Sequence, residues 1–108
     1  MAKSEVSVRL KQALHGPVVA MTTPFNKDLS LDTNGLKALT KFYAESGIQN
    51  VIVAGSTGEF YSLDDEERKL VIRTVVEESG GSMGVIGCAA HSGTSQALSL
   101  SQYCVAPG

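Results

Sequence analysis

Residues 50–59 of the chain read NVIVAGSTGE, and this stretch decides the fold. Positions 51–53 are apolar in succession, without the polar alternation of a strand that faces water on one side. Such a run predicts a strand over 50–54 that is covered on both faces, which is typical of parallel sheets. The turn GSTG follows directly at 55–58, so a glycine-rich loop lies at the carboxyl end of this strand.

The same order of apolar strand, loop and amphipathic helix is found on both sides of this stretch. We expect further strands at 17–21 and 84–89, and helices at 32–46, from a cap at 62 to about 79, and from 94 or 95 onward. Three strand–helix units in series predict an α/β fold whose parallel sheet has right-handed crossovers. Two architectures fit this order: the opening of a (β/α)8 barrel and a small open doubly wound domain.

Capping residues mark the ends of the expected helices. Asp32 is typical of an N-cap, and Gly47 stands where a helix often ends in a left-handed residue. Ser62 with Asp65 is interpreted as a capping box in which Asp replaces the usual Glu or Gln. Gly80 is expected to end the same helix.

Composition excludes several classes of partner. The 108 residues carry a formal net charge of −2 and no cluster of Lys or Arg, which argues against nucleic acid and against anionic membranes. No apolar run approaches a membrane span, and the N-terminus leads into no signal-peptide core. Cys88 and Cys104 are interpreted as reduced thiols of a cytoplasmic protein. The sequence shows no metal-ligand spacing, and we expect no metal site.

The turn at 55–58 carries the most chemical information. Its two glycines permit a tight turn and a close approach of a ligand, and successive amides in such a turn can bind an anion. The hydroxyls of Ser56 and Thr57 add hydrogen-bond donors or a step of proton transfer. A carboxylate or phosphate is the expected ligand. A plain strand-to-helix turn that binds no ligand would, however, require the same residues. The known phosphate-binding fingerprints are missing.

Two segments resemble one enzyme family. Residues 19–25 read VAMTTPF and residues 47–59 read GIQNVIVAGSTGE. They are similar to the T-P-F segment and the G-[TS]-T-G-E signature of the dihydrodipicolinate synthase and N-acetylneuraminate lyase family. Ser62-Leu63, Glu67-Arg68 and the strand from Gly84 also agree, so the resemblance covers nearly the whole chain from Gly16 onward.

The resemblance implies a fold and its boundaries. The family fold is a TIM barrel, of which this chain would form the N-terminal three βα units and be truncated before the rest. We therefore divide the chain into an N-terminal segment, 1–15, and a partial (β/α)8 barrel domain, 16–108. A short helix is expected within 4–15.

The resemblance also implies a function. Family members are class I aldolase-type lyases or synthases that condense or cleave 2-keto acids, commonly pyruvate, through a Schiff base to a lysine, with no cofactor. The amides of Ser56 and Thr57 would bind the keto acid carboxylate, and the Ser56 hydroxyl would join a tyrosine proton relay. Ser at this position leans toward the lyases rather than the synthases, but neither the keto acid nor the direction of the reaction follows from it.

In the family, the Schiff-base lysine, the relay tyrosines and a carboxylate-positioning arginine lie further along than this chain reaches. We assign the nucleophile to none of its lysines: Lys3, Lys11, Lys27, Lys37, Lys41 and Lys69. All of them are expected to be solvated. The 108 residues alone are therefore expected to be inactive, and to fold poorly or self-associate as a homo-oligomer, because the sheet would keep an open edge.

Three further residues receive an expected role. His91 is interpreted as a polar loop residue without an identified partner, in preference to a substrate contact. Tyr61 is expected to pack beneath the signature loop, in preference to lining the pocket. Glu59 is expected to accept backbone hydrogen bonds that hold the turn. Two rival hypotheses stay open: a small α/β domain that binds an anion without catalysis, and a module that assembles with itself.

Overall fold

The computed structural model describes residues 8, 11, 12 and 14–105 of the chain. Within the expected N-terminal helix, Val8, Lys11 and Gln12 have helical backbone, whereas residues 14 and 15 do not. The other positions of that helix, 4–7, 9–10 and 13, lie outside the described residues.

Three parallel strands form the sheet, in the order β1-β2-β3. They are β1 (Val18–Ala20), β2 (Asn50–Val53) and β3 (Gly84–Gly87). The register sets Ala20, Ile52 and Ile86 in one row across the sheet. The three predicted strands and their parallel order are confirmed, and each strand is one or two residues shorter than expected.

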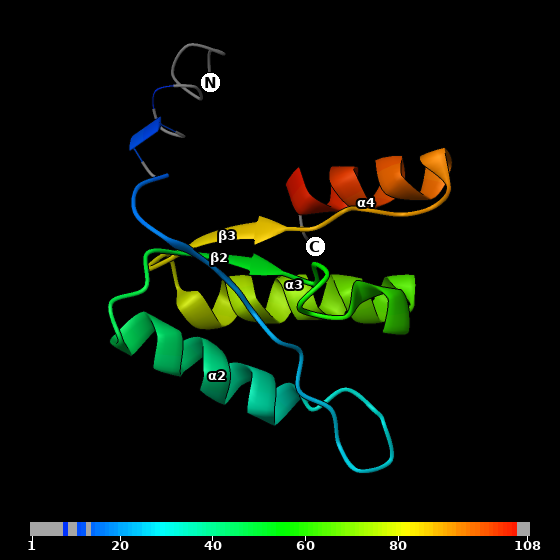
Figure 1. Ribbon diagram of the computed structural model, residues 1–108, viewed down its shortest axis with the longest axis horizontal. Coiled ribbons are helices and arrows are strands. Elements are labelled where there is room, and N and C mark those ends of the chain that lie inside the picture. The colour runs from blue at the N-terminus through cyan, green and yellow to red at the C-terminus, as the bar shows by residue number, and fades with distance from the viewer. Residues whose placement is uncertain (1–7, 9–10, 13, 106–108) are drawn as a thin grey trace.

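Each strand is followed by a helix, as predicted. The helices are α2 (Thr33–Glu45), α3 (Asp65–Ser79) and α4 (Thr94–Val105), and a short 3-10 helix, η1 (Phe60–Ser62), precedes α3. Figure 1 shows α2 and α3 running side by side along one flank of the strands, with α4 beyond β3. Within the described part of the chain, no helix has the length and apolarity needed to cross a bilayer.

The core lies between the sheet and these helices. Val51 and Val53 of β2 are 0% and 1% exposed and pack with Leu36 of α2 and with Val71 and Val75 of α3. Successive side chains of a strand alternate between faces, so Ile52 lies on the opposite face, where it is half-buried. Only one face of β2 is therefore fully covered by the described residues, in contrast to the expected cover on both.

The open face of the sheet carries apolar side chains. Val18 of β1 is 40% exposed and Ile86 of β3 is 37% exposed. Gly87, one residue on, lies on the helix side, where a Cβ would meet Cys104 of α4 and Ile72 of α3. The helices thus cover the face of Val53 and Gly87, and the face of Ile52 and Ile86 is the one that the interior of a barrel would use.

The caps confirm most of the expected helix boundaries and correct one. Asp32 caps α2 by accepting from the amide of Gly35 at 2.8 Å, and Gly80 ends α3 at φ +56°. The capping box of α3, however, joins Asp64 and Glu67: Asp64 Oδ1 accepts from the Glu67 amide at 2.8 Å, and Glu67 Oε1 from the Asp64 amide at 3.0 Å.

The predicted pair of Ser62 and Asp65 was wrong. Ser62 belongs to η1, where its amide donates to the carbonyl of Glu59 at 2.8 Å. An Asp side chain is also one methylene shorter than Glu, which is the residue that reaches back to the cap in such a box. The sequence is compatible with a capping box at Ser62 and Asp65 and with one at Asp64 and Glu67. The 3-10 turn takes up Ser62, so the second box forms.

Candidate functional site

The signature loop, residues 54–60, leaves the carboxyl end of β2 and closes on itself. The amide of Phe60 donates to the carbonyl of Gly55 at 3.2 Å, and the amide of Glu59 to that of Ser56 at 3.1 Å. Ala54 and Glu59 adopt left-handed backbone angles, φ +54° and +60°, although neither is a glycine. Such residues cost of order 1–3 kcal/mol each and persist where their surroundings hold them, often at ligand sites.

Ser56 and Thr57 are exposed at the tip of the signature loop. Their amides donate no hydrogen bond to any of the described residues, because the bonds that close the loop use the amides of Glu59 and Phe60. These two exposed residues therefore offer two neighbouring amides without a hydrogen bond to the described residues, and two hydroxyls, at the carboxyl end of β2. This arrangement can accept a carboxylate, since backbone amides in a tight turn bind anions.

The T-P-F segment lies directly against the signature loop. Thr23, only 5% exposed, donates its Oγ1 hydroxyl to the carbonyl of Gly58 at 2.7 Å. A Cβ added at Gly58 would lie 3.1 Å from the carbonyl oxygen of Met21 and from the backbone of Ala54. The two motifs, 35 residues apart in sequence, thus form one packed unit, and glycine is needed at 58 for the close approach.

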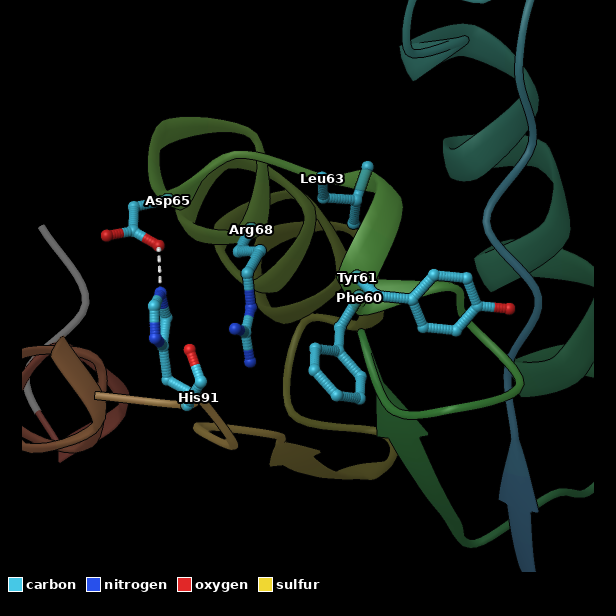
Figure 2. Close-up of a pocket in the computed structure, with 7 residues that line it drawn as sticks. Phe60, Tyr61, Leu63, Asp65, Arg68 and His91 are labelled. Carbon is cyan, nitrogen blue, oxygen red and sulfur yellow. Dashed lines mark ion pairs between the residues drawn. The ribbon is translucent and has the colours of Figure 1, made fainter. Parts of the chain in front are cut away.

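A pocket of about 310 Å³ lies behind this unit, between the start of α3 and the chain after β3. Its lining includes Phe60, Asp65, Arg68 and His91 (Figure 2). His91 Nε2 lies 3.6 Å from Asp65 Oδ1, and His91 Nδ1 accepts from the amide of Gly93 at 3.2 Å. His91 thus has the partner that the sequence did not reveal.

Arg68 is the residue of this pocket that sequence reasoning missed as a functional group. It is 2% exposed, and its Nη1 and Nη2 donate to the carbonyls of Ala90 and Cys88 at 2.7 and 2.8 Å. A signal was present, because position 68 shares a helical face with the buried residues Val71 and Val75. A charged residue on an inward face is informative, since buried charges are rare unless they are partnered.

The structure corrects three further expectations. Tyr61 is 72% exposed and lines the pocket of Figure 2, with its ring pointing away from Arg68, so it does not pack beneath the signature loop. The turn is held by the backbone amide of Glu59, and the Glu59 side chain lines a second pocket of about 230 Å³ with Phe25 and Leu29. Lys69 is not fully solvated: its side chain is 29% exposed, 3.5 Å from Glu66.

Both cysteines are free thiols. Burial raises the pKa of Cys104 above its ordinary value, and the positive charge of Arg68 opposes this shift. A thiol that is held neutral is a weak nucleophile, so Cys104 is not a candidate for covalent chemistry at neutral pH.

Comparison with known proteins identifies the family. The sequence profile described as the dihydrodipicolinate synthetase family matches residues 13–108. A curated relative, the 4-hydroxy-tetrahydrodipicolinate synthase of Chlorobium phaeovibrioides, is 42% identical over 91 residues, which are 84% of this chain and 31% of that protein.

Solved structures agree with this match. Dihydrodipicolinate synthase of Acinetobacter baumannii, crystallised with pyruvate, superposes with a TM-score of 0.84 at 27% identity, over 88% of this chain and 33% of its own. The N-acetylneuraminate lyase of Proteus mirabilis gives a TM-score of 0.83 at 27% identity, over 88% of this chain and 32% of its own.

The chain spans about a third of the length of the curated relatives that it matches. Its three strand–helix units correspond to the N-terminal part of their barrels. The 108 residues therefore belong to the dihydrodipicolinate synthetase family.

Proposed function

We propose that this chain forms the carboxylate-binding part of a Schiff-base lyase or synthase acting on pyruvate or a related 2-keto acid. The reaction is an aldol-type condensation or cleavage. The observation that carries the proposal is the pair of unused amides of the exposed residues Ser56 and Thr57, at the carboxyl end of β2. It is supported by a member of the same family that was crystallised with pyruvate.

The geometry suits a keto acid better than a phosphate. Two adjacent amides match the two oxygens of a carboxylate, and the described residues of the signature loop include no Lys or Arg. The Ser56 hydroxyl is exposed beside these amides and can pass a proton to or from a bound substrate. We therefore assign substrate binding to Ser56 and Thr57, and proton transfer to Ser56.

The proposal assigns the amine nucleophile to none of the described lysines. Lys11, Lys27, Lys37 and Lys41 are exposed. Lys69 lies on α3 between Glu66 and the ring of Tyr103, whose centroid is 5.6 Å from Nζ. These contacts suit an ammonium, whereas a Schiff base requires the free amine. The proposal includes no cofactor, because the imine between the substrate and the lysine accepts the electrons of the carbon–carbon bond that is broken.

A cytoplasmic homo-oligomer completes the proposal. Free thiols at Cys88 and Cys104 are in keeping with a reducing compartment. The exposed apolar side chains of Val18 and Ile86 favour association, because such a face is costly to leave in water. Size-exclusion chromatography of the 108 residues tests this part, and a discrete monomer would contradict it.

Borohydride trapping with pyruvate, followed by intact mass, tests the chemistry. It is run on the 108-residue chain and on a barrel chimera, in which this chain replaces the corresponding third of the Chlorobium phaeovibrioides synthase. We expect a reduced pyruvate adduct on the chimera only. An adduct on the short chain would require a nucleophile among its own lysines. If the parent synthase is active and the chimera folds but forms no adduct, the proposal is refuted. Anion binding without catalysis is then favoured.

Two substitutions at Ser56 separate binding from proton transfer. Ser56→Ala keeps the amide and removes the hydroxyl, so the chimera should still form the adduct while kcat falls by roughly 100-fold. Ser56→Thr is the matched control, since it keeps a hydroxyl and should retain most of the activity. An unchanged kcat in Ser56→Ala would remove the relay role and leave the binding role in place.

A further inference from the structure

Arg68 has contacts that the proposed function does not explain. Its side chain is 2% exposed near the start of α3, and Nε has no hydrogen-bond partner. Among the described residues, no carboxylate lies within ion-pair distance of the guanidinium. Burying a charge without a counter-ion is expensive, so its remaining contacts must be favourable ones.

Those contacts join two loops. Nη1 donates to the carbonyl of Ala90 and Nη2 to that of Cys88, at 2.7 and 2.8 Å, so the guanidinium holds the chain just after β3. The centre of the guanidinium also lies 4.9 Å from the centroid of the Phe60 ring, a distance typical of a cation–π contact. Figure 2 shows Arg68 between the ring of Phe60 on one side and His91 on the other.

Phe60 connects this guanidinium to the signature loop. Its amide closes the loop by donating to the carbonyl of Gly55 at 3.2 Å, and Gly55 directly precedes Ser56. At the other end, the amide of Cys88 donates to the carbonyl of Val53 at 3.0 Å, which ties the end of β3 to the end of β2. Arg68 therefore contacts both segments that fix where the signature loop begins and where it closes.

We propose that Arg68 is a positioning residue for the keto acid carboxylate: it sets the amides of Ser56 and Thr57 by clamping Phe60 against the chain at Cys88 and Ala90. This inference rests on the proposed function. The clamp needs a guanidinium, because its two terminal nitrogens donate to two different carbonyls while its Cζ lies over the ring. A lysine has a single nitrogen and cannot make these three contacts in the same way.

The test compares Arg68→Met and Arg68→Lys with Arg73→Met in the barrel chimera. Arg73 lies on the same helix but is exposed, so the same substitution there controls for loss of charge from α3. We expect Arg68→Met to raise KM for pyruvate by about tenfold or more and to lower kcat less than Ser56→Ala does, because the loop is displaced while the Ser56 hydroxyl is kept. Arg68→Lys should fall between Arg68→Met and the unsubstituted protein, and Arg73→Met should match the latter.

Hydrogen exchange in the same proteins separates positioning from general stability. The clamp predicts faster exchange at 55–60 and 88–92 in Arg68→Met, with exchange in α2 unchanged. Equal acceleration in all elements, or an unchanged KM with unchanged exchange, would overturn the proposal. If Arg68→Met does not fold, Arg68→Lys decides: a raised KM supports the clamp and an unchanged KM overturns it.

The proposed function fails separately. A folded, unsubstituted chimera without a pyruvate adduct would refute the keto acid chemistry. The exchange pattern would then still show whether Arg68 holds the two loops together.

Discussion

Replacing Thr23 by Val tests whether the T-P-F segment holds the signature loop. The two side chains have nearly the same shape, so the substitution removes the 2.7 Å hydrogen bond from Thr23 Oγ1 to the carbonyl of Gly58 without opening a cavity. Losing a hydrogen bond costs about 0.5–1.5 kcal/mol, and leaving its buried acceptor unpaired costs about 1–3 kcal/mol. Both Thr23 and Gly58 are buried, so water cannot readily replace the donor.

We expect Thr23→Val to lower the free energy of unfolding by about 2 kcal/mol, which is a roughly 30-fold change in the folding equilibrium. Urea unfolding of the barrel chimera, followed by circular dichroism, measures this change. The KM for pyruvate should rise as well, since Gly58 follows Thr57 directly and its displacement moves the amides that we propose to bind the carboxylate.

Thr23→Ser is the matched control, because it keeps the hydroxyl and loses one methyl group, worth about 0.8 kcal/mol. Thr23→Ser should therefore be more stable than Thr23→Val and bind pyruvate like the unsubstituted chimera. If Thr23→Val proves as stable as Thr23→Ser, the hydrogen bond does not hold the loop and the reasoning is refuted.

Three further predictions address the capping box, the close approach at the loop and the buried thiol. Asp64→Ala should destabilise the chimera by about 1 kcal/mol in urea unfolding, because it removes the side-chain acceptor for the Glu67 amide at the start of α3. Gly58→Ala should destabilise it by about 1–3 kcal/mol, since the new methyl would lie 3.1 Å from backbone atoms that cannot rotate away. Burial raises the pKa of Cys104, so its alkylation by iodoacetamide should accelerate at a higher pH than that of an exposed cysteine. The folded state then binds the proton of the Cys104 thiol more tightly than the unfolded state does. The free energy of unfolding that this difference contributes is fully present below about pH 8.5, and it is lost as the pH rises through the raised pKa.

The two substitutions have matched controls in the same region. Ser62→Ala should change stability by less than about 0.5 kcal/mol, because Ser62 does not cap α3. Gly55→Ala should be milder than Gly58→Ala, since its new methyl would meet only the side chain of Ile52, at 3.3 Å. Alkylation of Cys104 at the pH of an exposed thiol would contradict the stated effect of burial. Equal losses in Ser62→Ala and Asp64→Ala would contradict the assigned capping box.

Local patterns in the sequence were sufficient for the secondary structure and its order. The apolar run at 51–53 predicted β2, Asp32 predicted the start of α2, and Gly80 predicted the end of α3. These features depend on contacts between residues a few positions apart, such as the bond from the Gly35 amide to Asp32. Such contacts can be read from spacing alone, because the geometry of a helix turn or a strand is the same in every protein.

The sequence by itself therefore determined the three parallel strand–helix units, their family and the loop in which Ser56 and Thr57 are exposed. Only the tertiary structure decided that Thr23 bonds to Gly58 and that Arg68 bonds to Ala90, across 35 and 22 residues. The cap of α3 at Asp64 instead of Ser62 is a local matter, because the 3-10 turn over Phe60–Ser62 takes up Ser62. The physical reason is that a hydroxyl or a guanidinium offers the same donors wherever it stands, and the fold alone selects which distant carbonyl each of them meets.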